Sequence, residues 1–116
     1  MMMDWNAYTA QIGAAVREIS AANPALVKAY ASLHYATAKS TRLDARTREL
    51  IGLAVAVTLR CDGCIDAHTA AALKAGVTKD EMIEALGVAV MVNAGAAMVY
   101  SARTVDAWNT KNEQTA

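Results

Sequence analysis

The chain has 116 residues and a mass of 12.2 kDa, which suits one domain, and we interpret residues 1–116 as a single domain. Hydrophobic residues make up 55% of it and charged residues only 19%, a composition that excludes a disordered chain. Eleven basic and eleven acidic residues give a net charge of zero, so no nucleic-acid partner is expected and nothing suggests a membrane partner. The 27 alanines and the absence of Phe favour helices over strands, which predicts an all-α fold. Near-zero charge on so apolar a chain also favours a homo-oligomer.

The first predicted helix covers about residues 4–20, where apolar residues recur at helical spacing. Those residues are Tyr8, Ile12, Val16 and Ile19. The second predicted helix begins with Asn23 as its N-cap and Pro24 in the first turn, and runs to about Ser40. No basic segment followed by an apolar one opens the chain, so we expect no signal peptide.

The third predicted helix is capped by Asp44 and becomes wholly apolar through residues 50–57. A helix that is apolar on every face is expected to be buried. It should end near Arg60, because Asp62 and Gly63 form a turn signal. We expect Asp62 to cap a fourth helix that ends at Gly76, a suitable glycine for the position after a helix.

Thr78 and Glu81 have the spacing of a capping box, which predicts the start of a fifth helix. Residues 85–102 carry no charge, and we expect a break near residues 93–95 rather than a membrane-spanning helix, since the stretch contains Gly, Asn and Ser. A sixth helix would follow over residues 93–111, and the polar residues 112–116 should fray. The prediction is therefore about six helices in one oligomeric domain.

Cys61 and Cys64 form the only C-x-x-C pair of the sequence, and His68 follows four residues after the second cysteine. On a helix, residues i and i+4 share a face, so the imidazole of His68 should lie beside Cys64. A place in the first helical turn favours a thiolate, which lowers the pKa of the Cys64 thiol below its ordinary value of about 8.5. The nearby carboxylates of Asp62 and Asp66 oppose this effect.

Two such thiols can carry out peroxide chemistry. One thiolate attacks an oxidant and becomes a sulfenic acid, and the second thiol condenses with it to a disulfide. A dithiol donor then reduces that disulfide by exchange. The absence of a secretory signal, together with two thiols that are normally reduced, indicates a cytoplasmic protein.

Glu49 is a further candidate, because it lies where the third predicted helix becomes apolar. In one continuous helix it would be about 18 Å from Cys61. If the chain folds back near Arg60, Glu49 returns toward the cysteines. We expect Glu49 and His68 to remain offset along the helix axes, so that a water molecule joins them, and a carboxyl group in such an apolar neighbourhood suits a proton relay.

These residues resemble the E-x(11)-C-x-x-C-x-x-x-H signature of AhpD-like alkylhydroperoxidases, members of the carboxymuconolactone decarboxylase superfamily. The resemblance covers about residues 33–108. It implies an all-α fold, homo-oligomers (commonly trimers to hexamers) and antioxidant, peroxiredoxin-type reduction of a peroxide substrate without metal, haem or another cofactor. It implies a dithiol electron donor such as a lipoyl or thioredoxin-like protein.

Carried over by position, the resemblance makes Cys64 the peroxidatic thiol, Cys61 the resolving thiol, His68 the activating base and Glu49 the relay partner. One departure concerns Gly63, since better-characterised peroxidases of the family carry His immediately before the second cysteine. The peroxidase activity should therefore be weaker than in those relatives, or the substrate different. Lactone decarboxylation is disfavoured, because the decarboxylase branch lacks the cysteine pair.

Three alternatives stay open beside the peroxidase. The chain could be a general disulfide reductase, or a non-catalytic oligomer in which the cysteine pair senses redox state. It could also bind zinc through Cys61, Cys64, His68 and Glu49, although structural zinc sites usually have two separated ligand pairs. His34, the second histidine, is expected to be a core or interface residue rather than a catalyst.

Overall fold

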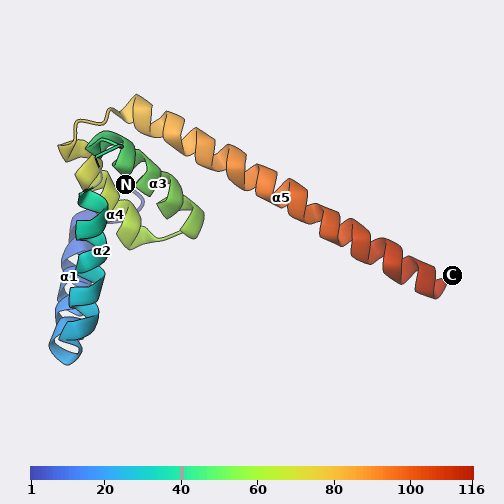
Figure 1. The fold of residues 1–116 in the computed structure, drawn as a ribbon, viewed down its shortest axis with the longest axis horizontal. Coiled ribbons are helices and arrows are strands. Elements are labelled where there is room, and N and C mark those ends of the chain that lie inside the picture. The colour runs from blue at the N-terminus through green and yellow to red at the C-terminus, as the bar shows by residue number, and fades with distance from the viewer. Residues whose placement is uncertain (40) are drawn as a thin grey trace.

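A computed structural model describes residues 1–39 and 41–116, and over those residues it contains helices and no strand (Figure 1). The prediction of an all-α domain is confirmed. The five helices are α1 (Trp5–Ala22), α2 (Pro24–Ala38), α3 (Ala45–Leu59), α4 (Asp62–Lys74) and α5 (Lys79–Thr115). The end predicted for the second helix, Ser40, lies outside the described residues.

Short polar side chains begin the helices. Asn23 caps α2 by accepting a hydrogen bond from the backbone N–H of Leu26, and Asp44 caps α3 through the N–H of Thr47, both as predicted. Thr78 and Glu81 form the predicted capping box at the start of α5. These bonds satisfy N–H groups that a helix leaves unpaired at its start.

The prediction that Asp62 caps the fourth helix was wrong. The N-cap of α4 is Cys61, and Asp62 is already in the first turn. The chain leaves α3 through a single left-handed residue, Arg60, so Cys61 is the first residue free to adopt the extended conformation of an N-cap.

The predicted break near residues 93–95 is absent, and α5 continues through it to Thr115. There are consequently five helices where six were expected, and residues 112–115 are helical rather than frayed. Gly87 and Gly95 do not break the helix, because Gly costs only about 1 kcal/mol relative to Ala in a helix. The amide of Asn93 does not act as a cap, since it donates to the carbonyl of Ala89 (2.7 Å) and to Oγ1 of Thr58 on α3 (2.9 Å).

The centre of the domain is formed by α3 and α4, which fold into a helical hairpin, and by the first turns of α5 packed on α3 (Figure 1). Its core consists of Leu53, Ala72 and Val77, with Leu50 and Met82 packed against them. α1 and α2 form a second hairpin, and α1 reaches α4. The chain is elongated, with a radius of gyration of 19.7 Å against about 13 Å for a compact domain of this length.

An ion pair ties the start of α3 to the start of α5. The guanidinium group of Arg46 donates to the carboxylate of Glu81 and to the carbonyl of Gly76, the left-handed glycine (φ 80°) after α4. The hydrogen bond from Arg46 and those from Thr78 hold the pKa of Glu81 at about 2, below its ordinary value of 4.5. This cluster fixes the direction in which α5 leaves the hairpin.

α5 is apolar and mostly uncovered. From residue 90 onward every residue of the helix is exposed, and Figure 1 shows this part extending away from the rest of the chain. By length and composition alone, α5 could cross a membrane. Its alanines and glycines and the polar side chains of Asn93 and Ser101 equally suit close packing against other helices.

Candidate active site

The cysteine pair is presented by the sharp turn between α3 and α4. Arg60 adopts the left-handed conformation (φ 54°, ψ 46°), and the N–H of Cys61 donates back to the carbonyl of Ala56 (3.1 Å). This closes α3 within two residues and places Cys61 at the N-terminus of α4. The unpaired N–H groups and the positive end of the helix dipole are therefore directed at the cysteines.

Cys61 and Cys64 form a disulfide, with their Cα atoms 5.2 Å apart. The N–H of Cys64 lies 3.2 Å from Sγ of Cys61, so the sulfur of Cys61 is the capping atom of α4. Cys64 lies in the first turn, as predicted. Both residues are partly buried, which leaves the pair within reach of a small oxidant or reductant.

His68 and Glu49 are bonded directly. Nδ1 of His68 lies 2.7 Å from Oε2 of Glu49, so the prediction that a water molecule joins them was wrong. The contact forms because His68 lies against α3 at Gly52, which has no side chain to keep the ring away. The side chains are 32% and 21% exposed, respectively, so the pair is largely shielded from solvent.

This bond assigns different roles to the two ring nitrogens of His68. With Nδ1 facing a carboxylate, the proton of the neutral imidazole is favoured on Nδ1, where it is donated to Glu49. Nε2 then has its lone pair available to accept a proton from another group. The arrangement is that of an oriented base and suits the proton transfers of thiol chemistry.

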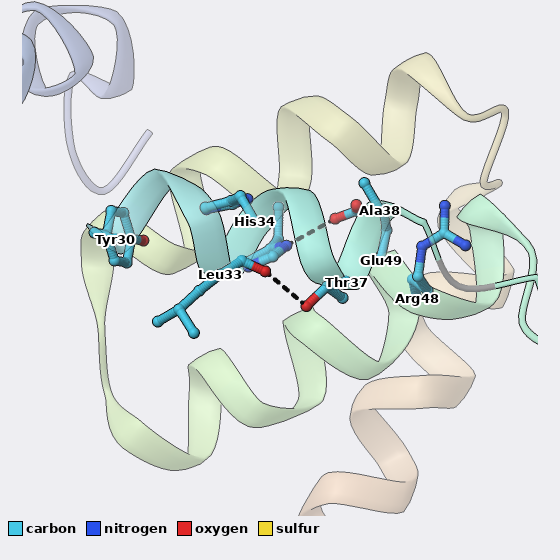
Figure 2. A pocket seen from close by; sticks show the side chains of 8 residues that line it. Tyr30, Leu33, His34, Thr37, Ala38, Arg48 and Glu49 are labelled. Carbon is cyan, nitrogen blue, oxygen red and sulfur yellow. Dashed lines mark hydrogen bonds and ion pairs between the residues drawn. The ribbon is translucent and has the colours of Figure 1, made fainter. Parts of the chain in front are cut away.

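A pocket of about 310 Å³ lies over the Glu49–His68 pair (Figure 2). Three helices line it: α2 through Tyr30, Leu33, His34, Thr37 and Ala38, α3 through Arg48 and Glu49, and α4 through His68. In Figure 2 the labelled side chains extend from Tyr30 at one end of the pocket to Arg48 at the other. A ligand in this pocket would contact the side chain of His68.

His34 was predicted to be a core or interface residue, and in the chain it is an exposed residue that lines this pocket. Its ring packs edge-on against Tyr30, with ring centroids 5.4 Å apart. The two residues are four positions apart and so share a helix face, a signal that the sequence offered. The sequence gives no indication that this face meets Glu49.

α1 covers part of the cysteine helix, a contact that sequence reasoning missed. The hydroxyl of Thr9 donates to the carboxylate of Asp66 over 2.7 Å. A Cβ atom on Gly63, between the cysteines, would lie 3.7 Å from the hydroxyl of Tyr8. Asp66, expected to oppose a thiolate, thus has a partner on α1. Only the tertiary fold brings these residues together, since they are more than 50 positions apart.

The zinc alternative requires the four candidate residues to converge on one point. Within residues 1–39 and 41–116, no group of three or more His, Cys, Asp or Glu side chains is arranged to hold a metal ion. The sulfurs are bonded to each other and Glu49 is bonded to His68, so the four residues form two pairs.

Comparisons with known proteins identify the family of the chain. The sequence model of the carboxymuconolactone decarboxylase family matches residues 24–107. An uncharacterized protein of Haemophilus influenzae is 43% identical over 109 residues, which cover 94% of this chain and 96% of that protein. A protein of Paracoccus denitrificans, "uncharacterized protein 4 in cox locus", is 35% identical over 88 residues, which cover 76% of this chain and 79% of that protein.

The fold also occurs in a crystal structure of a protein from Methanobacterium thermoautotrophicum. That structure matches with a TM-score of 0.64 and 34% sequence identity, covering 68% of this chain and 89% of the other. The match therefore includes nearly all of the archaeal chain.

Proposed function

The chain belongs to the carboxymuconolactone decarboxylase family, and from this membership and its site geometry we propose that it is an AhpD-like, thiol-dependent peroxidase. The observation that carries the proposal is the Nδ1–Oε2 bond between His68 and Glu49, on the two helices that meet at the cysteine turn. A disulfide with a purely structural role has no need of an oriented base on the same helix. A redox-active dithiol does, because every step of its cycle moves a proton.

The cycle starts from the reduced pair. Nε2 of His68 accepts the proton of the Cys64 thiol, and the thiolate attacks the peroxide ROOH. An S–O bond forms as the O–O bond breaks, and the leaving alkoxide takes the proton from His68 and departs as ROH. Cys64 is oxidised to the sulfenic acid and the peroxide is reduced to an alcohol.

The thiol of Cys61 then attacks the sulfur of the sulfenic acid. The S–S bond forms, and the hydroxyl group leaves with the thiol proton as water. The product is the Cys61–Cys64 disulfide. A dithiol donor, of the lipoyl or thioredoxin type, restores the two thiols through a mixed disulfide and is itself oxidised to a disulfide.

The proposal is tested by peroxide consumption with dihydrolipoamide as donor, in the wild type and in two cysteine variants. Cys64→Ser should abolish turnover, since it removes the attacking sulfur. Reduced beforehand and assayed without donor, Cys61→Ser should consume about one equivalent of peroxide per chain and stop at a sulfenic acid, which a dimedone adduct would reveal. Full turnover by Cys64→Ser would contradict the proposal.

We propose further that the active form is a cytoplasmic homo-oligomer, a trimer or a hexamer. The support is the large exposed apolar surface of α5, which includes Val92, Val99 and Trp108. Monomeric soluble proteins rarely expose a surface of this kind. A reducing compartment would keep both thiols in the form that reacts with peroxide.

A second function, a redox sensor without turnover, is favoured by that same uncovered helix together with the disulfide. In a sensor, oxidation of Cys61 and Cys64 would change assembly or partner binding. Mass measurement of the reduced and oxidised protein, beside the turnover assay, separates the two functions. A redox-dependent mass without turnover supports the sensor, and turnover at constant mass supports the enzyme.

A further inference from the structure

Gly52 lies in the middle of α3, three residues after Glu49 and on the same face of the helix. A Cβ atom built on it would lie 2.7 Å from Nδ1 of His68, 2.9 Å from Cε1 and 3.1 Å from Cγ. Cβ atoms essentially never lie within 3.0 Å of a heavy atom to which they are not bonded, and 3.1 Å is also tighter than most real contacts. The imidazole ring therefore occupies the space that any other residue at position 52 would fill.

The three nearest atoms all belong to the ring of His68, and no backbone atom of α4 is among them. The tightest contacts at position 52 are therefore with one side chain. The other helical glycines differ: Gly87 and Gly95 have nothing within 4 Å of a built Cβ, Gly13 meets the end of the Arg17 side chain at 3.5 Å, and Gly63 meets the hydroxyl of Tyr8 at 3.7 Å.

Local preference argues against glycine at this position. Alanine is the better residue in a helix interior, and the chain uses it freely on both sides of Gly52. At Gly52 the loss in helix stability is balanced by a contact with a residue of the candidate site. The same contact places Nδ1 of His68 within 2.7 Å of Glu49.

We propose that Gly52 is a positioning residue: its missing side chain forms a slot on α3 that holds the His68 imidazole with Nδ1 on Glu49 and Nε2 available to the thiols. The slot and the carboxylate, one helical turn apart, fix the position and the rotation of the ring together. The effect on turnover rests on the proposed peroxidase function, whereas the position of the ring does not.

The test uses Gly52→Ala, with Gly87→Ala as the matched control because its Cβ meets open space. The added methyl group should push the ring off α3 and break the bond to Glu49. The ¹⁵N-coupled signal of the hydrogen-bonded Nδ1 proton should be lost in Gly52→Ala and retained in Gly87→Ala. Since the chain has two histidines, His34→Gln assigns the signal.

Turnover of peroxide should fall about 10- to 100-fold in Gly52→Ala, the size of effect expected when the partner that orients a functional histidine is lost. Glu49→Gln should have a similar effect, and the double variant should be no worse than either single one, because both remove the same bond. An unchanged Nδ1–H signal and unchanged turnover in Gly52→Ala would overturn the proposal.

Two further outcomes are also decisive. If the wild type consumes no peroxide, the proposed function fails, while the Nδ1–H signal still tests the role of Gly52. If Gly52→Ala does not fold, removal of the ring in Gly52→Ala/His68→Ala should restore folding. Continued misfolding of that double variant would show that position 52 does not act through His68 and would refute the slot.

Discussion

The α3–α4 hairpin and the distal part of α5 (residues 90–115) are both rich in small apolar residues, yet only the hairpin contains buried residues. Three of the five buried core residues, Leu53, Ala56 and Ala72, lie in the hairpin. Every residue of the distal part of α5 is exposed in the single chain. Apolar composition therefore indicates that a helix needs a partner, and leaves open whether the partner is in the same chain.

The polar residues of the two regions differ in the same way. In the hairpin, Glu49 and His68 pair with each other, and Arg46 joins the hairpin to the start of α5. In the distal part of α5, Asn93 bonds to Thr58 on α3, whereas further along the helix the side chains make contacts within it, such as the hydroxyl of Ser101 to the carbonyl of Ala97 and Arg103 over the ring of Tyr100. The candidate site thus lies in the region whose polar side chains join different helices.

The largest expected effect concerns the exposed distal part of α5. Val99→Glu places a charge in the middle of the apolar surface of α5, where Val99 is 74% exposed. If that surface is the oligomer interface, the variant should be a monomer, because a buried unpaired charge opposes association. Light scattering measures the mass, and Lys111→Glu, at an already polar position of α5, is the control. An oligomer of unchanged mass would show that the interface lies elsewhere.

The second effect concerns the buried side. Leu53 is 3% exposed, and Leu53→Ala should lower the free energy of unfolding by about 2–5 kcal/mol. Leu73→Ala, where the leucine is 71% exposed, should cost less than about 1 kcal/mol. The free energies are measured by urea unfolding of chains that also carry Val99→Glu, so that assembly does not contribute to them. Equal losses in the two variants would contradict the core described above.

The smallest effect concerns the junction of the two regions. The pKa of Glu81 is about 2 in the folded chain and ordinarily 4.5, so its ion pair with Arg46 stabilises the fold above pH 4.5. This contribution is lost as the pH falls from 4.5 toward 2. Glu81→Gln should therefore unfold with a flatter pH dependence in acid, followed by circular dichroism. Glu113→Gln, near the end of α5, should leave the wild-type profile unchanged.

Local signals predicted the helix starts well. Asn23, Asp44 and Thr78 each cap a helix through a side chain that reaches an N–H within three residues, and such bonds depend on neighbouring residues alone. The prediction of an interruption near Asn93 was wrong because the contacts of this residue do not depend on neighbouring residues alone. The amide of Asn93 is satisfied partly by Thr58 on another helix, a contact that no local pattern reports.

For the candidate site, the spacing of Glu49, Cys61, Cys64 and His68 selected the residues, and their chemical roles remain predictions. The spacing did not predict the direct contact between His68 and Glu49. The rise per residue gives positions along the helix axes, and it does not show how closely two side chains on neighbouring helices approach. It also could not show that Tyr8 and Thr9 lie over the cysteine turn, or that His34 lines the pocket.

The sequence by itself determined the all-α class, the caps of α2, α3 and α5, and the placing of two cysteines at a helix start, because these follow from propensity, capping and spacing along the chain. The tertiary structure alone decided that His68 meets Glu49 directly, that α5 is continuous, and that α3 is partly buried while the distal part of α5 is exposed. The physical reason is that contacts between helices depend on the shape of the space between them. At Gly52 that space is set by the absence of one side chain.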